Sequence, residues 1–102
     1  MELNVKDRLL LLSILPKEGN ITTLKIVRKL REDLSFSEEE HKAFEIKIEG
    51  NMTLWNQEKA VSKNIDIGEK ANDVIVEALN ALSKNSKLRE EHLPIWDLFV
   101  EA

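Results

Sequence analysis

Hydrophobic residues in the first part of the chain recur every three or four positions, a spacing typical of amphipathic helices. The first such helix is expected from about Val5 to Leu15. Asn4 can cap its N-terminus and Pro16 cannot continue it, so both ends carry a local signal. Additional leucines widen the apolar face, which predicts burial on more than one side.

Two more helices follow in the same half of the chain. One is predicted to begin near Thr22 or Thr23, whose hydroxyl groups suit an N-cap. The next is short and is expected to end near Phe44. Ser37 and Glu40 have the spacing of a capping box, in which each side chain bonds the backbone N–H of the other residue.

From Phe44 onward the hydrophobic period changes to two, which predicts β-strands. A hairpin is expected that pairs residues 44–48 with residues 52–56 around a Gly50-Asn51 turn. A two-stranded hairpin is marginal in water, so it must pack on the helices or find a third strand. Residues 63–67 alternate in the same way and are the candidate for that third strand.

The last third of the chain again has helical periodicity. One helix is expected to open at Gly68-Glu69 and to close near Asn85, the candidate left-handed residue. A final helix is expected over about residues 90–101, with Pro94 tolerated in its first turn. No linker or repeat interrupts the pattern. We therefore expect one α+β domain over residues 1–102, mainly helical, with four to five helices and a small antiparallel sheet.

The order helix, helix, short helix, hairpin over residues 5–56 resembles a winged helix-turn-helix, whose third helix enters the DNA major groove. Here the third helix carries glutamates at positions 38–40, which phosphate groups would repel. Nucleic-acid binding would instead use the basic face of the second helix, formed by Lys25, Arg28, Lys29 and Arg31. The simpler interpretation is that these four side chains form the solvated face of an amphipathic helix.

Composition restricts the classes of function. The 102 residues include 15 basic and 19 acidic side chains, which gives a net charge of −4. A chain with this charge is not expected to be drawn as a whole to nucleic acid or to anionic membranes. The absence of cysteine excludes disulfides, thiolate zinc sites and cysteine nucleophiles.

Signatures of catalysis are also missing. The chain has three glycines and neither a phosphate-binding loop nor a nucleophile elbow. Glu38 and His41 have the spacing of a di-metal helix motif, but Arg89 occupies the equivalent position before His92. We therefore expect a protein that is not an enzyme, without catalytic residues, metal, cofactor or small-molecule substrate.

Three aromatic residues are candidates for protein binding. Trp55 falls out of register with Met52 and Leu54 on its predicted strand, while Trp96 and Phe99 lie on the terminal helix. Each of the three can either pack in the core or anchor a protein partner, because tryptophan in particular is enriched at interface hot spots.

The longest apolar stretch, residues 9–15, is far too short to span a membrane. Acidic residues precede it, unlike the basic start of a secretion signal. These features predict a cytoplasmic protein that does not associate with membranes.

Three segments resemble small proteins encoded by tailed phages and prophages of Gram-positive bacteria: residues 12–24 (LSILPKEGNITTL), residues 36–41 (FSEEEH) and residues 90–93 (EEHL). The similarity extends over nearly the whole chain. It implies a viral or prophage origin and a location in the host bacterial cell. Such proteins generally carry no assigned activity, so the resemblance supplies no catalytic residues.

The function expected from these observations is that of a small, non-catalytic phage or prophage accessory protein. It would act by binding another protein, either a second copy of itself or a host or phage protein. The alternative is a winged-helix-like protein that binds nucleic acid through the basic face of the second helix.

Overall fold

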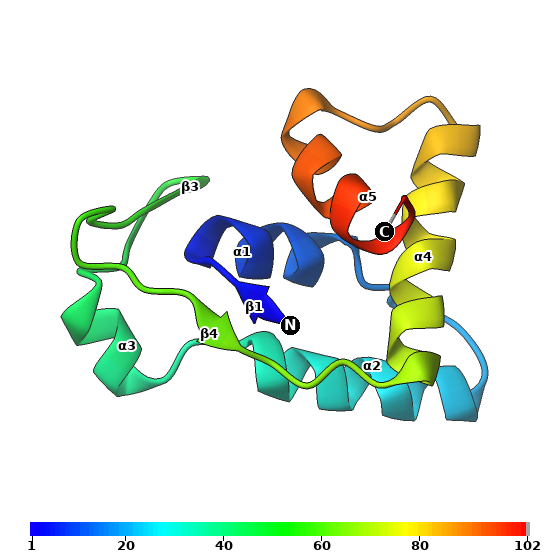
Figure 1. Ribbon diagram of the computed structural model, residues 1–102, viewed down its shortest axis with the longest axis horizontal. Coiled ribbons are helices and arrows are strands. Elements are labelled where there is room, and N and C mark those ends of the chain that lie inside the picture. Colours follow the sequence, from blue (N-terminus) through cyan, green and yellow to red (C-terminus); the bar gives the residue numbers. More distant parts are fainter. Residues whose placement is uncertain (102) are drawn as a thin grey trace.

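In the computed structural model, which describes residues 1–101, helices and short strands combine in an α+β fold, as predicted (Figure 1). The described residues form five α-helices, one 3-10 helix and four strands. In chain order these elements are β1 (Glu2–Leu3), α1 (Val5–Ile14), α2 (Ile21–Leu34), α3 (Glu38–Ala43), β2 (Lys47–Glu49), β3 (Met52–Leu54), β4 (Lys63–Asn64), α4 (Glu69–Lys84), the 3-10 helix η1 (Glu90–His92) and α5 (Leu93–Phe99).

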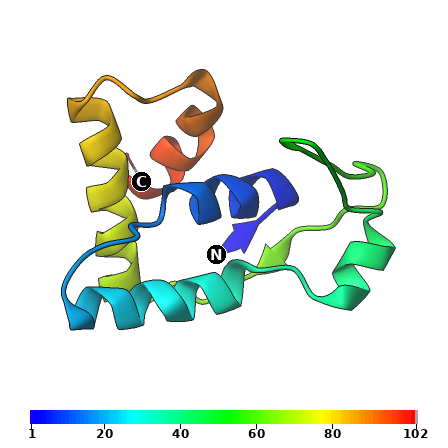
Figure 2. The same cartoon turned by 180° about the vertical axis from the view of Figure 1, so that it is seen from behind.

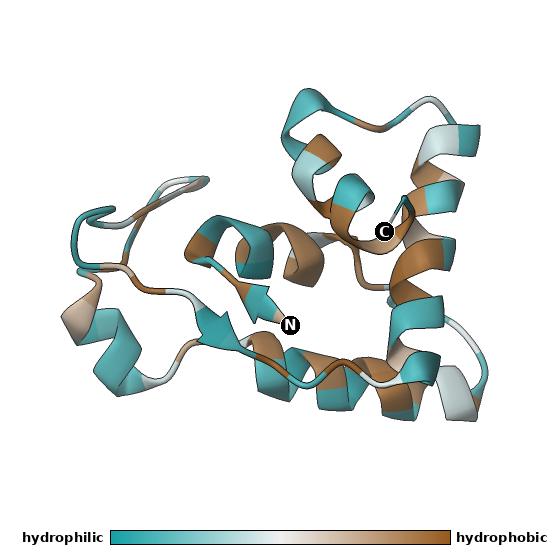
Figure 3. Cartoon of the chain, viewed as in Figure 1, coloured by the Kyte–Doolittle hydropathy of each residue, from teal (hydrophilic) through white to brown (hydrophobic). Residues whose placement is uncertain are grey.

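One hydrophobic core is shared by α1, α2, α4 and α5, with α1 lying between α2 and α5 (Figure 2). Leu11, Ile75, Leu79 and Ile95 are completely buried there, and hydrophobic stretches lie on all four helices (Figure 3). Burial of each such side chain contributes roughly 1.5–3 kcal/mol. The core therefore joins the first and last parts of the chain.

The N-termini of the first two long helices are capped by asparagine. The Asn4 side chain accepts the Asp7 N–H at 2.8 Å, which confirms the predicted cap of α1. The cap of α2 is Asn20, whose Oδ1 accepts the Thr23 N–H at 2.8 Å, so the predicted threonine cap is wrong. Asn20 has an extended backbone and its side chain reaches the third helical N–H, which makes it the preferred type of cap residue.

The helical spacing predicts that Val5, Leu9 and Leu12 form the apolar face of α1, and the buried face differs from it in part. Val5, Arg8 and Leu11 are buried, whereas Leu9 and Leu12 are only half-buried. Their spacing of three residues places Arg8 on the same stripe as its apolar neighbours. Arg8 is fully buried, with 0% of its surface exposed, so a charge occupies the centre of a helix face that otherwise packs in the core.

The Arg8 guanidinium is enclosed by the end of α2 and the start of α3. Its Nε donates to the Leu34 carbonyl at 3.1 Å, and its Nη2 donates to the Ser35 carbonyl at 2.7 Å. Nη1 lies 2.6 Å from Glu40 Oε2, and the guanidinium carbon lies 3.9 Å from the centre of the Phe36 ring. We call Arg8 and these four partners the Arg8 clamp. It compensates the burial of the charge with bonds on several sides.

Glu40 belongs both to this clamp and to the cap of α3. Its carboxylate accepts the Ser37 N–H at 3.1 Å, and the Ser37 hydroxyl accepts the Glu40 N–H at 3.1 Å, which confirms the predicted capping box. The hydrogen bond from Arg8 is the main reason that the pKa of Glu40 falls from 4.5 to about 2. The first turn of α3 is thereby attached to α1.

The strands form two separate two-stranded antiparallel sheets. β2 pairs with β3, and β4 pairs with β1, with Leu3 opposite Lys63. The prediction that residues 63–67 would extend the hairpin is wrong, because only Lys63 and Asn64 are in a strand and their partner is β1. Ile65, just after β4, is buried in the core instead.

The winged-helix hypothesis rests on element order alone. Helices α1, α2 and α3 precede the β2–β3 hairpin, but no third strand joins the hairpin within residues 1–101. The predicted hairpin is confirmed as an antiparallel pair, with strands shorter than expected.

The end of the chain departs from the prediction in two details. Ser86, with φ of 55°, is the left-handed residue after α4, whereas Asn85 has φ of −92°. The expected last helix is divided into η1 and α5, and Pro94 lies in the first turn of α5 as predicted. His92 is buried, and its Nδ1 accepts the Arg89 N–H at 3.0 Å.

Candidate protein-interaction surface

The base of the β2–β3 hairpin is held by a cluster of polar contacts around Glu45. The Glu45 carboxylate accepts from Lys59 Nζ at 2.9 Å and from Asn56 Nδ2 at 3.1 Å. These two bonds, Lys59 first, lower the pKa of the Glu45 carboxyl. The Asn56 N–H donates to the carbonyl of Phe44, a buried residue, at 2.8 Å. The hairpin is therefore fixed at its base, although its strands leave the core.

The turn of the hairpin sets its register. Gly50, the first of the two turn residues, has φ of 62°, whereas Asn51 has no positive φ. Glycine with positive φ at the first position is characteristic of the type II′ turn, which matches the twist of a tight hairpin. The turn places Glu49 opposite Met52 and Ile48 opposite Thr53.

This register puts apolar side chains on both faces of the hairpin. Ile48 shares one face with Thr53, while Met52 and Leu54 lie on the other. Ile48 therefore does not share an apolar face with Met52 and Leu54. Ile48 is 74% exposed, Met52 is 64% exposed and Leu54 is 40% exposed. We call these three residues the hairpin surface.

The concentration of exposed apolar residues on the hairpin is unusual for this molecule. Within residues 1–101, seven large hydrophobic side chains are exposed, and three of them lie on the six residues of β2 and β3. Scattered surface hydrophobics need no explanation, but three of them on one projecting element make the hairpin the candidate binding surface.

Trp55 follows the hairpin and is half-buried. It lines a cavity of about 260 Å³ together with Asn4, Val5 and Lys6 at the start of α1 and with residues of the following loop. Its ring is thus placed where the hairpin meets the body of the protein, beside the hairpin surface.

The two aromatic candidates of the terminal helix belong to the core. Phe99 is buried, and Trp96 is half-buried and packs against the same cluster. In this structure Phe99 is therefore not available as a surface anchor. Ile95, which the periodicity did not single out, is the completely buried residue of α5, and Leu93 is exposed.

The basic residues of α2 are partly placed as expected. Lys25, Arg28 and Lys29 are exposed, and Arg31 is half-buried. Lys29 Nζ lies 3.1 Å from Asp33 Oδ1, so one of the four positive charges already has a carboxylate partner on its own helix.

A groove of about 620 Å³ is lined by residues of α2 and by residues at and just before the start of α4. Three lysines and three carboxylates line it: Lys25, Lys29, Lys70, Asp33, Asp66 and Glu69. Because these charges balance, the groove does not form a basic channel of the kind that attracts a polyanion.

No group of three or more side chains that could hold a metal ion occurs in the described part of the chain. His41 is exposed, and its ring meets the edge of Phe36 with centroids 6.2 Å apart. Among residues 1–101, no helix has the length and hydrophobicity needed to cross a bilayer.

The residues of the hairpin surface were missed at the sequence level, although a signal existed. Gly50 at the first turn position predicts a two-residue type II′ turn, and that turn alone fixes Ile48 opposite Thr53. Comparison with protein-family models, with curated proteins and with solved structures returned no match.

Proposed function

We propose that this chain is a small, non-catalytic accessory protein that binds another protein through its hairpin. The observation that carries the proposal is the exposure of Ile48, Met52 and Leu54 on a two-stranded sheet with which no other strand of residues 1–101 pairs. Apolar side chains and unpaired strand edges both favour association with another polypeptide. The resemblance to phage and prophage proteins supports a role inside a bacterial host cell.

The base of the hairpin supports the same function. Glu45, Asn56 and Lys59 hold the projecting strands in one position before any partner arrives. A binding element that is already ordered loses less conformational entropy on association. Trp55, beside the strands, supplies an aromatic side chain of the type that is enriched at interface hot spots.

Nucleic-acid binding through α2 is the second candidate. The exposure of Lys25 and Arg28 favours it. The pairing of Lys29 with Asp33 and the glutamates on α3 weaken it, because both reduce the attraction to phosphate.

A capture experiment tests the first candidate. The protein and its Ile48→Ser variant are immobilised and exposed to extract of a Gram-positive bacterium. The matched control is Ile21→Ser, because Ile21 is 70% exposed on a different part of the surface. A soluble second copy of this chain added to the extract, or a bacterial protein, that is retained by the original chain and by the control but lost by the Ile48→Ser variant is the expected result.

Identical retention by all three proteins would contradict docking at the hairpin. Retention on a DNA column that falls steeply with salt, and that is lost in a Lys25→Glu variant, would favour the second candidate instead.

A further inference from the structure

We propose that the hairpin surface binds a second copy of this chain, with β2 pairing antiparallel to β2 of the other copy about a two-fold axis at Ile48. The inference rests on the proposed function and names its partner. It is derived from the free edge of β2, from its charge pattern and from the position of the hairpin.

The outer edge of β2 has a free backbone position at Ile48. Glu49 and Met52 flank the two-residue turn, so they form a hydrogen-bonded pair. Ile48 and Thr53 are then a non-hydrogen-bonded pair, and the N–H and C=O of Ile48 point away from β3. At the preceding outward position, the Ile46 N–H is used by the His41 carbonyl at 3.0 Å. The edge that is free to pair with another strand therefore extends over the three residues of β2.

The charges on this edge are self-complementary. Lys47 and Glu49 precede and follow Ile48 in β2. Their side chains lie on the face of the strand opposite to that of Ile48. In a two-fold antiparallel pair centred on Ile48, each Lys47 lies directly opposite the Glu49 of the other copy. Cross-strand neighbours of this kind have Cβ atoms about 4.5–5.5 Å apart, and opposite charges at this distance stabilise a sheet. If Lys47 and Glu49 exchanged places in only one of the two copies, each cross-strand pair would consist of two like charges.

Pairing of the two β2 strands also reduces the solvent exposure of apolar side chains on the hairpin. The two Ile48 side chains meet on one face, with Thr53 of each copy beside them. On the other face, Leu54 and Met52 flank the charged pairs. The result is a four-stranded sheet of the order β3, β2, β2, β3, and a sheet of this size is more stable than an isolated hairpin.

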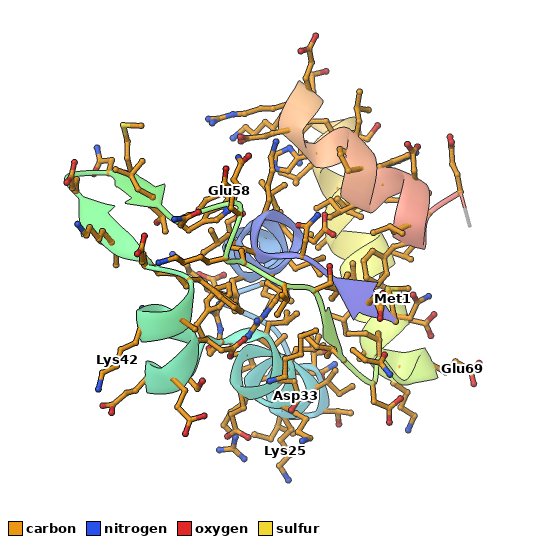
Figure 4. The ribbon with its side chains drawn as sticks, turned by 60° about the vertical axis from the view of Figure 1, so that its left-hand side comes forward. Met1, Lys25, Asp33, Lys42, Glu58 and Glu69 are labelled. Atoms are coloured by element: carbon orange, nitrogen blue, oxygen red, sulfur yellow. The ribbon has the colours of Figure 1, made fainter. Side chains whose placement is uncertain are left out.

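The position of the hairpin permits this approach. In Figure 4 the two strands extend away from the helical core, on the far side of the molecule from α4 and α5. The outer edge of β3 is the competing site, but its residues Met52, Thr53 and Leu54 carry no charge that would select a register. Charge complementarity therefore favours β2.

The contact is small, since each strand contributes three residues. It lies below the size of a standard stable interface, so we expect a dimer that forms in the micromolar range or at higher concentrations. The association should weaken as salt concentration rises, because the charged pairs are exposed to solvent.

Charge exchange in one strand tests this arrangement. In Lys47→Glu and in Glu49→Lys, every cross-strand pair becomes a pair of like charges, so each variant alone should dimerise about tenfold more weakly. When the two variants are mixed, every pair is again of opposite charge, and the mixture should associate as well as the original chain. The double variant with both changes should also dimerise normally. Sedimentation equilibrium up to about 1 mM measures all four.

The matched controls are Lys87→Glu and Glu77→Lys, which exchange the same charges at exposed positions away from the hairpin and should leave dimerisation unchanged. Circular dichroism verifies that each variant is folded. A monomer at every concentration would overturn the inference, and so would a dimer that ignores the exchange at positions 47 and 49. Neither result contradicts the proposed function if Ile48→Ser still removes a captured bacterial protein, because the partner is then a different chain.

Discussion

The Arg8 clamp and the hairpin surface reverse the usual distribution of polar and apolar groups in opposite ways. Arg8 is a charge in the interior, but its guanidinium has carbonyl, carboxylate and aromatic partners on several sides. Ile48 and Met52 are apolar, yet 74% and 64% of their surfaces are exposed. The first reversal is compensated within the chain. The second is not, and the proposed binding of another protein rests on it.

The largest expected decrease in the free energy of unfolding follows from removing the guanidinium group of the Arg8 clamp. Arg8→Met keeps the length of the side chain but leaves the Leu34 and Ser35 carbonyls without their donor and Glu40 without its cation. Removal of one partner of a buried ion pair costs about 3–5 kcal/mol. We expect a loss of this size in the free energy of unfolding, measured with urea. Lys6→Met, on the exposed side of α1, is the control, and a loss below about 1 kcal/mol for Arg8→Met would show that the clamp is not structural.

A smaller decrease in the free energy of unfolding is expected when the Glu40 carboxylate is replaced by a neutral amide. Glu40→Gln keeps a residue suited to the capping box and removes the charge that faces Arg8. A hydrogen bond to a charged group contributes about 1.5–3 kcal/mol, so the variant should lose about this much stability at pH 7.

The pH dependence provides the second readout for Glu40. Its pKa is lowered from 4.5 to about 2 on folding, so its stabilisation is complete above about pH 5 and is lost as pH falls toward 2. The difference in stability between the original chain and Glu40→Gln should therefore shrink between pH 5 and pH 2. A constant difference over this range would mean that the carboxylate does not act through its charge.

The smallest effect on stability is expected at the hairpin. Ile48→Ser should change the free energy of unfolding by less than about 1 kcal/mol, because this side chain is already exposed. Leu79→Ala, at a completely buried position, should cost about 2–5 kcal/mol in the same measurement. If the two variants were equally destabilised, the Ile48 side chain would contribute to the folded core as much as the buried Leu79 side chain does, contrary to its exposure.

The parts of the fold that were predictable from the sequence depend on neighbouring residues. The cap at Asn4 and the capping box of Ser37 and Glu40 involve positions three residues apart, and both are confirmed. The cap of α2 was predicted at the wrong residue. Asn20 and Thr22 are both suitable cap residues, and the pattern alone does not choose between them.

The parts that were missed depend on contacts between distant residues. Arg8 was not expected in the core, because its partners lie more than 25 positions away along the chain. The pairing of β1 with β4 involves strands of two residues, too short for an alternating pattern to be recognised. At the candidate surface, alternation placed Ile48 and Met52 in strands, but exposure depends on what lies over each face.

The pairing of β1 with β4 also has a consequence for the order in which the chain folds. Leu3 and Lys63 are about 60 residues apart, so the entropy cost of closing this loop must be met before the two strands gain any contact. The capped ends of α1, α2 and α3 need only local segments and can form first. During synthesis, β1 leaves the ribosome well before β4 exists, and it must wait unpaired until its partner emerges. The sheet at the start of the sequence is therefore expected to be among the last parts of the molecule to form.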